Sequence, residues 1–147
     1  MSLILTVDTN IWISTFLTPR GYSARLKNYW QANRFDVVIS PQLLAEISEV
    51  LERPRIQAKY QYTSTEVKKY LQLIAELAET VQITGSLKAC RDPDDDMLLE
   101  TAIIGRATHL VSRDEDITRD TDVSQYLEKY GVKAITVQRF LETLIVP

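Results

Sequence analysis

The feature that most constrains the fold of this chain is a series of short apolar runs, each followed by a stretch with helical patterning. Residues 3–7 form an almost wholly apolar run, as expected of a strand that is buried on both faces. Further runs lie at residues 37–39, 109–111 and 134–137, with a weaker one at 81–83. Because strands that alternate with helices favour a parallel sheet covered on both faces, we predict an α/β fold.

Local signals place helices between these strands. Thr9 or Asn10 is expected to cap the helix after the first strand, and Ser40 followed by Pro41 is a good helix start. Residues 63–66 fit a capping box. We expect a helix over residues 11–17 and, after a turn at Pro19 and Gly21, a second helix that ends at about residue 32. Further helices are expected from 41 to before Pro54, from 63 to about 79, over 94–105 and over 138–144.

Length and composition predict a single cytoplasmic domain. The chain has 147 residues, of which 45% are hydrophobic and 25% charged, and this suits one domain with one core. No apolar run approaches the ~20 residues that a membrane helix needs, and the first residues lack the basic segment of a signal peptide. The single cysteine, Cys90, cannot form an internal disulfide.

The net charge of −3 is unevenly distributed along the chain. Residues 1–91 carry 11 basic and 8 acidic side chains, whereas residues 92–122 carry 3 basic and 10 acidic ones. Most of these acids are explained by a solvated surface. Asp94 and Asp95 suit the first turn of a helix, where negative charge is stabilising. The remaining acids are candidates for binding a cation.

Four acidic residues that are distant in sequence are expected at one edge of the sheet. They are Asp8 at the end of the first strand, Glu46 in the helix after the second, Asp96 at the start of a later helix, and Asp114 after the strand at 109–111. Ligands of open α/β sheets bind at the carboxyl ends of the strands. Because oxygen ligands suit Mg²⁺ or Mn²⁺, we predict that these four residues hold such an ion.

The surroundings of these acids support this interpretation. Glu46 lies at the margin of an apolar helix face, where a half-buried carboxylate needs a partner; an arginine across the helix is the alternative to a metal. Asp96 and Glu100 share one helix face, and their repulsion would turn into attraction around a divalent cation.

Other kinds of site have little support in the sequence. There is no cluster of Cys and His for zinc, and His109, the only histidine, is interpreted as a structural residue. The chain also lacks the Gly-rich loop of a P-loop or dinucleotide site and the G-x-S-x-G motif of a serine hydrolase.

The order and spacing of the acidic motifs resemble the PIN domain. The resemblance rests on Asp-Thr-Asn at residues 8–10, on residues 40–46, on residues 96–102 and on residues 110–114, and it covers essentially the whole chain. Residues 90–96 are similar to the branch of this family that contains VapC-type toxins of toxin–antitoxin pairs.

This resemblance implies a three-layer α/β/α sandwich with a central parallel sheet of about five strands. It also implies that the chain cleaves RNA with Mg²⁺ or Mn²⁺ held by Asp8, Glu46, Asp96 and Asp114. The supporting residues that it implies are Asn10, Ser112, Glu100 and Asp116. Similar proteins are often homodimers, and toxins of this kind are blocked by an antitoxin protein.

An RNA substrate would need basic side chains around the acidic edge to hold its flanking phosphates. Arg113 is the best candidate by position, and an ordinary surface charge is the alternative. The further candidates are Arg20, Arg25 and Arg91. The aromatic residues that could stack on bases, although core packing is the stronger expectation, are Tyr22, Tyr29 and Trp30.

Three other functions are weighed against a nuclease. A phosphatase similar to haloacid dehalogenases needs a second Asp two residues after the first, where this chain has Asn10. A receiver-like signalling domain needs adjacent acids before the first strand ends and a Lys after the last strand, and neither is found. A PIN fold that only binds RNA or protein is disfavoured because all four expected acids are present.

Overall fold

The computed structural model describes residues 2–88, 93–113 and 115–145. These residues form a sheet of five parallel strands in the order β3-β2-β1-β4-β5. The strands are β1 (Ile4–Val7), β2 (Asp36–Ile39), β3 (Glu79–Thr80), β4 (His109–Ser112) and β5 (Lys133–Thr136). The helices are α1 (Thr9–Leu17), α2 (Tyr22–Gln31), α3 (Pro41–Leu51), α4 (Pro54–Tyr60), α5 (Ser64–Leu77), α6 (Pro93–Ile104), α7 (Glu115–Thr118), α8 (Thr121–Glu128) and α9 (Val137–Ile145).

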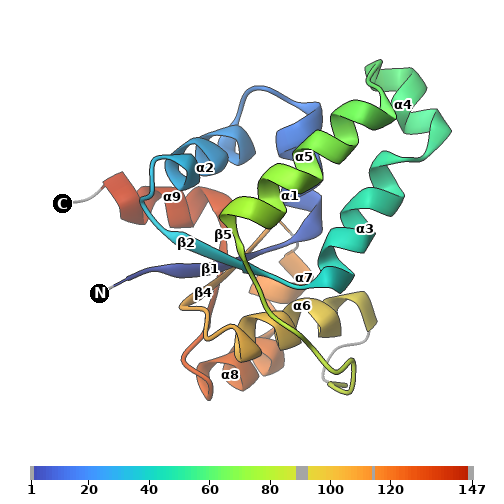
Figure 1. Cartoon of the computed structure of the whole chain (residues 1–147). Coiled ribbons are helices and arrows are strands. Elements are labelled where there is room, and N and C mark those ends of the chain that lie inside the picture. The colour runs from blue at the N-terminus through green and yellow to red at the C-terminus, as the bar shows by residue number, and fades with distance from the viewer. Residues whose placement is uncertain (1, 89–92, 114, 146–147) are drawn as a thin grey trace.

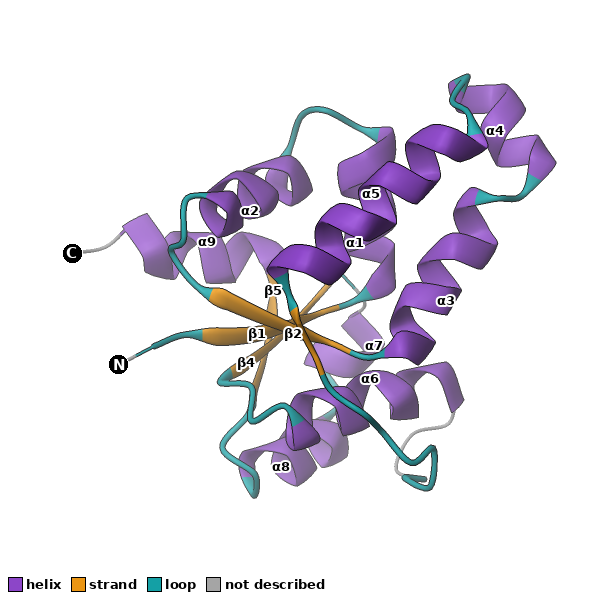
Figure 2. Cartoon of the chain, viewed as in Figure 1, coloured by secondary structure: helices purple, strands orange, loops and turns teal. Residues whose placement is uncertain are grey.

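Helices cover both faces of the sheet. On one side lie α1, α2, α3, α5 and α9, and on the other lie α6 and α8 (Figure 1). Figure 2 shows the strands enclosed between these two layers. The predicted three-layer α/β/α sandwich is therefore confirmed. Among the helices in the described part of the chain, none combines the length and the apolar character needed to cross a bilayer.

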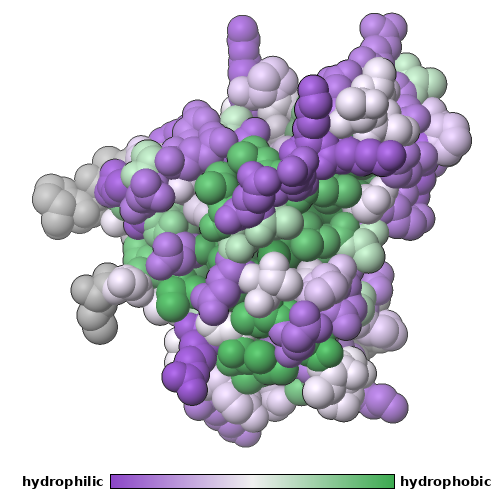
Figure 3. Space-filling view, in the orientation of Figure 1, coloured by the Kyte–Doolittle hydropathy of each residue, from purple (hydrophilic) through white to green (hydrophobic). Residues whose placement is uncertain are grey.

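The core forms between the central strands and the helices on each side. Leu5 of β1, Ile47 of α3 and Leu99 of α6 have no exposed surface, and burying side chains of this size stabilises a fold by about 1.5–3 kcal/mol each. Seen from the side of Figure 1, hydrophobic residues gather near the β2–β3 edge, while hydrophilic residues cover the helices above it (Figure 3). This core fixes the strands whose ends carry the acids.

Three local features differ from the sequence expectation. Asp8, and not Thr9 or Asn10, caps α1, because its carboxylate accepts a hydrogen bond from the backbone N–H of Asn10 at 3.3 Å. The helix from residue 41 ends before Pro54 as expected, but Pro54 also opens the separate helix α4, where a missing N–H is no disadvantage. The third strand consists of residues 79–80 and so lies directly before the weak apolar run at 81–83.

His109 packs as a structural residue at the start of β4. Its Nδ1 lies 2.9 Å from the Thr108 hydroxyl oxygen, and its ring meets Phe140 edge-on with 5.3 Å between ring centroids. Burial lowers the pKa of His109, and the positive charge of Lys133 lowers it further. The imidazole belongs to the packing of β4 against α9, in agreement with its interpretation from the sequence.

Gly105 follows α6 where the chain passes close to β2, so we predict that a side chain there destabilises the fold. A Cβ atom would lie 2.7 Å from Val38 Cγ2 and 2.9 Å from the Thr101 carbonyl oxygen. Gly105→Ala should lower the free energy of unfolding by about 1–3 kcal/mol, measured by urea denaturation. In a Val38→Ala background the same substitution should have a smaller effect, and an equal effect would contradict the steric explanation.

Candidate active site

The strand order creates a crevice beside the first strand. The chain passes from β1 outward through β2 and β3, and then crosses back to β4 on the other side of β1. Ligands of open α/β sheets bind at such a reversal, outside the carboxyl ends of the strands. Val7 pairs with Val111, and the backbone N–H of Asp8 donates to the Val111 carbonyl oxygen at 2.9 Å. Asp8 is therefore placed beside Ser112, the last residue of β4.

The carboxylate of Asp8 is buried and held in one orientation. Only 7% of the residue is exposed. Ser112 Oγ donates to its Oδ2 at 2.7 Å, and the Asn10 N–H donates to its Oδ1. The Thr9 hydroxyl lies 3.4 Å from the same Oδ1. These donors replace part of the water that a buried carboxylate loses, and they fix its orientation inside the crevice.

Thr9 connects Asp8 to an acid in the separate helix α3. Its hydroxyl donates to Glu46 Oε1 at 2.9 Å, so the carboxylates of Asp8 and Glu46 both approach the same hydroxyl. Thr9 itself is buried, with 4% exposed. The sequence predicts a capping role for Thr9 and does not predict this contact with Glu46. A hydroxyl residue directly after the acid that ends a buried strand is the signal that points to this role.

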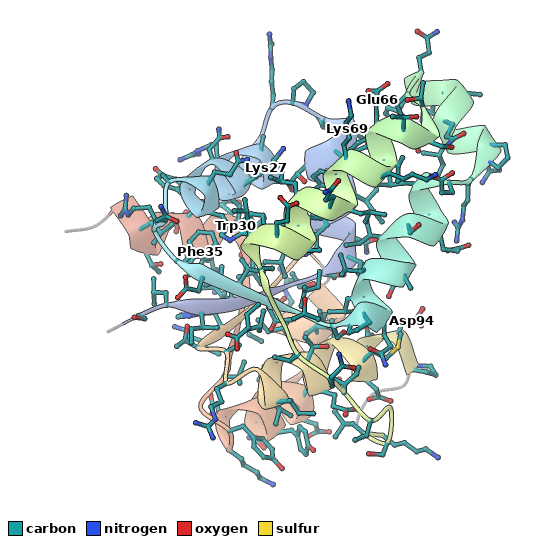
Figure 4. The ribbon with its side chains drawn as sticks, in the orientation of Figure 1. Lys27, Trp30, Phe35, Glu66, Lys69 and Asp94 are labelled. Carbon is teal, nitrogen blue, oxygen red and sulfur yellow. The ribbon has the colours of Figure 1, made fainter. Side chains whose placement is uncertain are left out.

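A polar cavity of about 220 Å³ collects four acidic side chains. Asp8 and Glu46 line it together with Asp94 and Asp95 from the first turn of α6. Figure 4 shows Asp94 at the start of α6, next to the start of α3. The remaining lining residues are Thr9, Asn10, Leu43 and Leu98. We refer to this hollow as the acidic cavity.

The oxygen atoms that line the acidic cavity are of the kind that binds a hard divalent cation. Its charged groups are carboxylates, which are preferred ligands of Mg²⁺ and Mn²⁺. Within the described residues, no three His, Cys, Asp or Glu side chains are grouped tightly enough to hold a metal ion. The acids therefore surround an open space and do not form a closed cage.

Asp96 and Glu100 line a second, neighbouring cavity of about 440 Å³, while Asp94 lines both. Asp96 is buried, with 7% exposed. Its role as a metal ligand stays a prediction, as does that of Asp114. Asp114 lies outside the described residues, and so does the side chain of Asp116.

The carboxylate of Glu100 anchors the loop before α6. It accepts hydrogen bonds from the N–H groups of Thr84 at 2.6 Å and Gly85 at 3.0 Å, and from the Thr84 hydroxyl at 2.9 Å. Burial acts to raise the pKa of Glu100, but the hydrogen bonds from Thr84, Leu87 and Gly85 outweigh it and lower the pKa. Glu100 does not line the acidic cavity.

The basic and aromatic candidates are distributed around the site. Arg113 lines a groove that adjoins the acidic cavity at Asn10. Arg20 and Arg25 are exposed near the start of α2 and do not line the cavity, and Arg91 lies outside the described residues. Trp30 packs in the core, with its ring centroid 5.1 Å from that of Trp12.

A comparison with known families decides the membership of this chain. The sequence profile of the PIN domain matches residues 5–116. The chain belongs to the PIN domain family. PIN domains are generally nucleases, and these nucleases generally use divalent metals. Asp8, which follows β1, and Ser112, the last residue of β4, both lie within the matched segment of this PIN domain.

This PIN domain also has a curated archaeal relative. The uncharacterized protein MJ1680 of Methanocaldococcus jannaschii is 24% identical to it over 138 residues. The alignment covers 92% of this chain and 88% of the archaeal protein. The similarity therefore extends beyond the matched segment and over most of both chains.

The hydrogen bonds of Glu100 make a testable contribution to the stability of this PIN domain. A carboxylate whose pKa is lowered by folding stabilises the fold above its unfolded pKa of about 4.5, and this stabilisation is lost as the pH falls through the lower, folded pKa. Glu100→Gln should lower the free energy of unfolding at neutral pH by about 1–3 kcal/mol, measured by urea denaturation. The variant should also lose less stability than the wild type on acidification below about pH 4.5.

Glu142→Gln is the matched control, because Glu142 is exposed on α9. This variant should keep both the stability and the acid dependence of the wild type. If Glu100→Gln behaved like Glu142→Gln, the loop would not depend on the Glu100 carboxylate.

Proposed function

We propose that this PIN domain is an endoribonuclease that hydrolyses phosphodiester bonds of RNA with Mg²⁺ or Mn²⁺. The proposal rests on the approach of Asp8 and Glu46 to the single hydroxyl of Thr9 at the carboxyl edge of the sheet. Asp94 and Asp95 add further negative charge to the same cavity. Carboxylates gathered in this way repel one another and an RNA phosphate, and a bound cation reverses both effects.

The proposed metal ligands are Asp8, Glu46, Asp96 and Asp114. When bound, a divalent cation lowers the pKa of water and neutralises the charge that grows on the phosphoryl oxygens. Ser112 and the Asn10 N–H hold the Asp8 carboxylate, so its orientation does not have to be acquired on binding. The exposed Asn10 side chain lines the cavity, where it can donate to a substrate phosphate.

A narrower form of this proposal makes the protein the toxin of a toxin–antitoxin pair. Its support is the similarity of residues 90–96 to VapC-type toxins. An antitoxin that covered the acidic cavity would exclude RNA from the proposed ligands. A homodimer, as formed by similar proteins, belongs to the same narrower proposal.

The purified protein should cleave single-stranded RNA in Mn²⁺ or Mg²⁺ and lose this activity when EDTA removes the metal. Asp8→Asn preserves the shape of the side chain but removes its charge. This variant should reduce the rate of cleavage by about 10²- to 10³-fold, measured with end-labelled RNA on a denaturing gel.

Asp36→Asn provides the matched control for this experiment. Asp36 is an exposed aspartate at the amino end of β2, whereas Asp8 follows the carboxyl end of β1. The Asp36→Asn variant should therefore cleave like the wild type. Cleavage that resists EDTA and is equal in the wild type and Asp8→Asn would refute the metal-dependent reaction. Binding of RNA without cleavage in any metal would favour a non-catalytic binding module.

A further inference from the structure

A groove of about 490 Å³ adjoins the acidic cavity. It runs along the exposed side of α1, and Arg113 and the last residue of α4, Tyr60, line it from the neighbouring elements. The rest of the lining comes from α1 and from the residue that follows it: Asn10, Ile13, Ser14, Leu17 and Thr18. Asn10 lines the acidic cavity as well, so the two hollows meet there. We call this hollow the α1 groove.

The α1 groove differs from the acidic cavity in charge. The cavity is lined by four acids, whereas the described lining of the groove contains no acid and includes the exposed cation Arg113. Lys59 adds a second cation beside the groove, with its Nζ 5.3 Å from the centroid of the Tyr60 ring. In the absence of a metal ion, the α1 groove is therefore the more favourable of the two hollows for a phosphate group.

Tyr60 presents an aromatic ring at the rim of the α1 groove. The residue is 44% exposed, and α4 ends directly after it because Gln61 adopts a left-handed conformation with φ of 54°. Ile13 and Leu17 lie one turn apart on α1 and form an apolar strip next to the hydroxyl residues Ser14 and Thr18. Exposed aromatic rings in basic grooves are the platforms on which proteins stack the bases of single-stranded nucleic acids.

We propose that the α1 groove binds the nucleotide next to the phosphodiester that is cleaved at the acidic cavity, a proposal that rests on the ribonuclease function above. The base stacks on Tyr60, and Arg113 contacts the phosphate. Hydroxyl and amide groups of Ser14, Thr18 and Asn10 supply hydrogen-bonding partners for the sugar and the phosphate. The substrate is single-stranded at this position, since only an unpaired base exposes a face for stacking.

The test measures binding of adenosine and of 5′-AMP in EDTA, so that binding does not depend on a metal. In protein with ¹³C-labelled methyl groups, both ligands should shift the NMR signals of Ile13 and Leu17. Tyr60→Ala should weaken the binding of both ligands by about tenfold, because each loses its stacking partner. Arg113→Ala should weaken only 5′-AMP, because adenosine has no phosphate.

Two control variants separate stacking from other effects. Tyr60→Phe keeps the ring and should bind both ligands as the wild type does. Tyr22→Ala removes a tyrosine that is also 44% exposed and has its own cation, with Arg25 Cζ 6.0 Å from the ring centroid, but that does not line the groove. This variant should leave the binding of both ligands unchanged.

Three results would overturn the proposal. They are the absence of shifts at Ile13 and Leu17, an equal loss of affinity in Tyr22→Ala and Tyr60→Ala, and shifts of the same methyl groups on dilution without ligand, which would mark an interface between copies of this chain. Failure of the ribonuclease proposal gives a different result. In that case 5′-AMP still binds as predicted, but the wild type shows no metal-dependent cleavage of RNA.

Discussion

The parallel pairing of β1 with β4 is the constraint on which the rest of the site depends. Val7 lies opposite Val111, and the next hydrogen bond of the ladder brings Asp8 beside Ser112. A shift of one residue in this pairing would turn every side chain of β1 to the other face of the sheet and remove Asp8 from the Ser112 hydroxyl. Both faces of β1 are packed, so the shift would place Thr6 where Leu5 and Val7 now fill the core and would disrupt the packing on both sides. The apolar core therefore fixes the position of the first acid.

The acidic cavity gathers four acidic side chains, whose like charges repel one another. One hydroxyl, that of Thr9, lies close to both Asp8 and Glu46, and its single proton can be donated to only one carboxylate at a time. Glu100, in contrast, receives several hydrogen bonds from one loop and stabilises the position of that loop. Local arrangements that do not favour stability are expected at functional sites, where they serve binding or chemistry.

The parts of the fold that follow local rules could be predicted from the sequence. The Ser40 cap before Pro41 and the capping box that begins at Thr63 are formed as expected, because each depends on neighbours within four residues. The hydrogen bonds of Glu100 to the loop at 84–87 could not be foreseen, since they depend on how the loop folds back on α6. Asp94 was assigned to helix capping charge alone, and its place in the acidic cavity follows from the packing of α6 beside α3.

We propose that acids from separate segments hold one divalent cation at the carboxyl edge of the sheet. Paramagnetic broadening of backbone amide NMR signals by substoichiometric Mn²⁺ tests it directly. We expect strong broadening at residues 8–10, at Glu46 and at the first turn of α6, and loss of this pattern in Asp8→Asn. Broadening that is unchanged in Asp8→Asn, or that is centred on the exposed acids around Asp120, would contradict it.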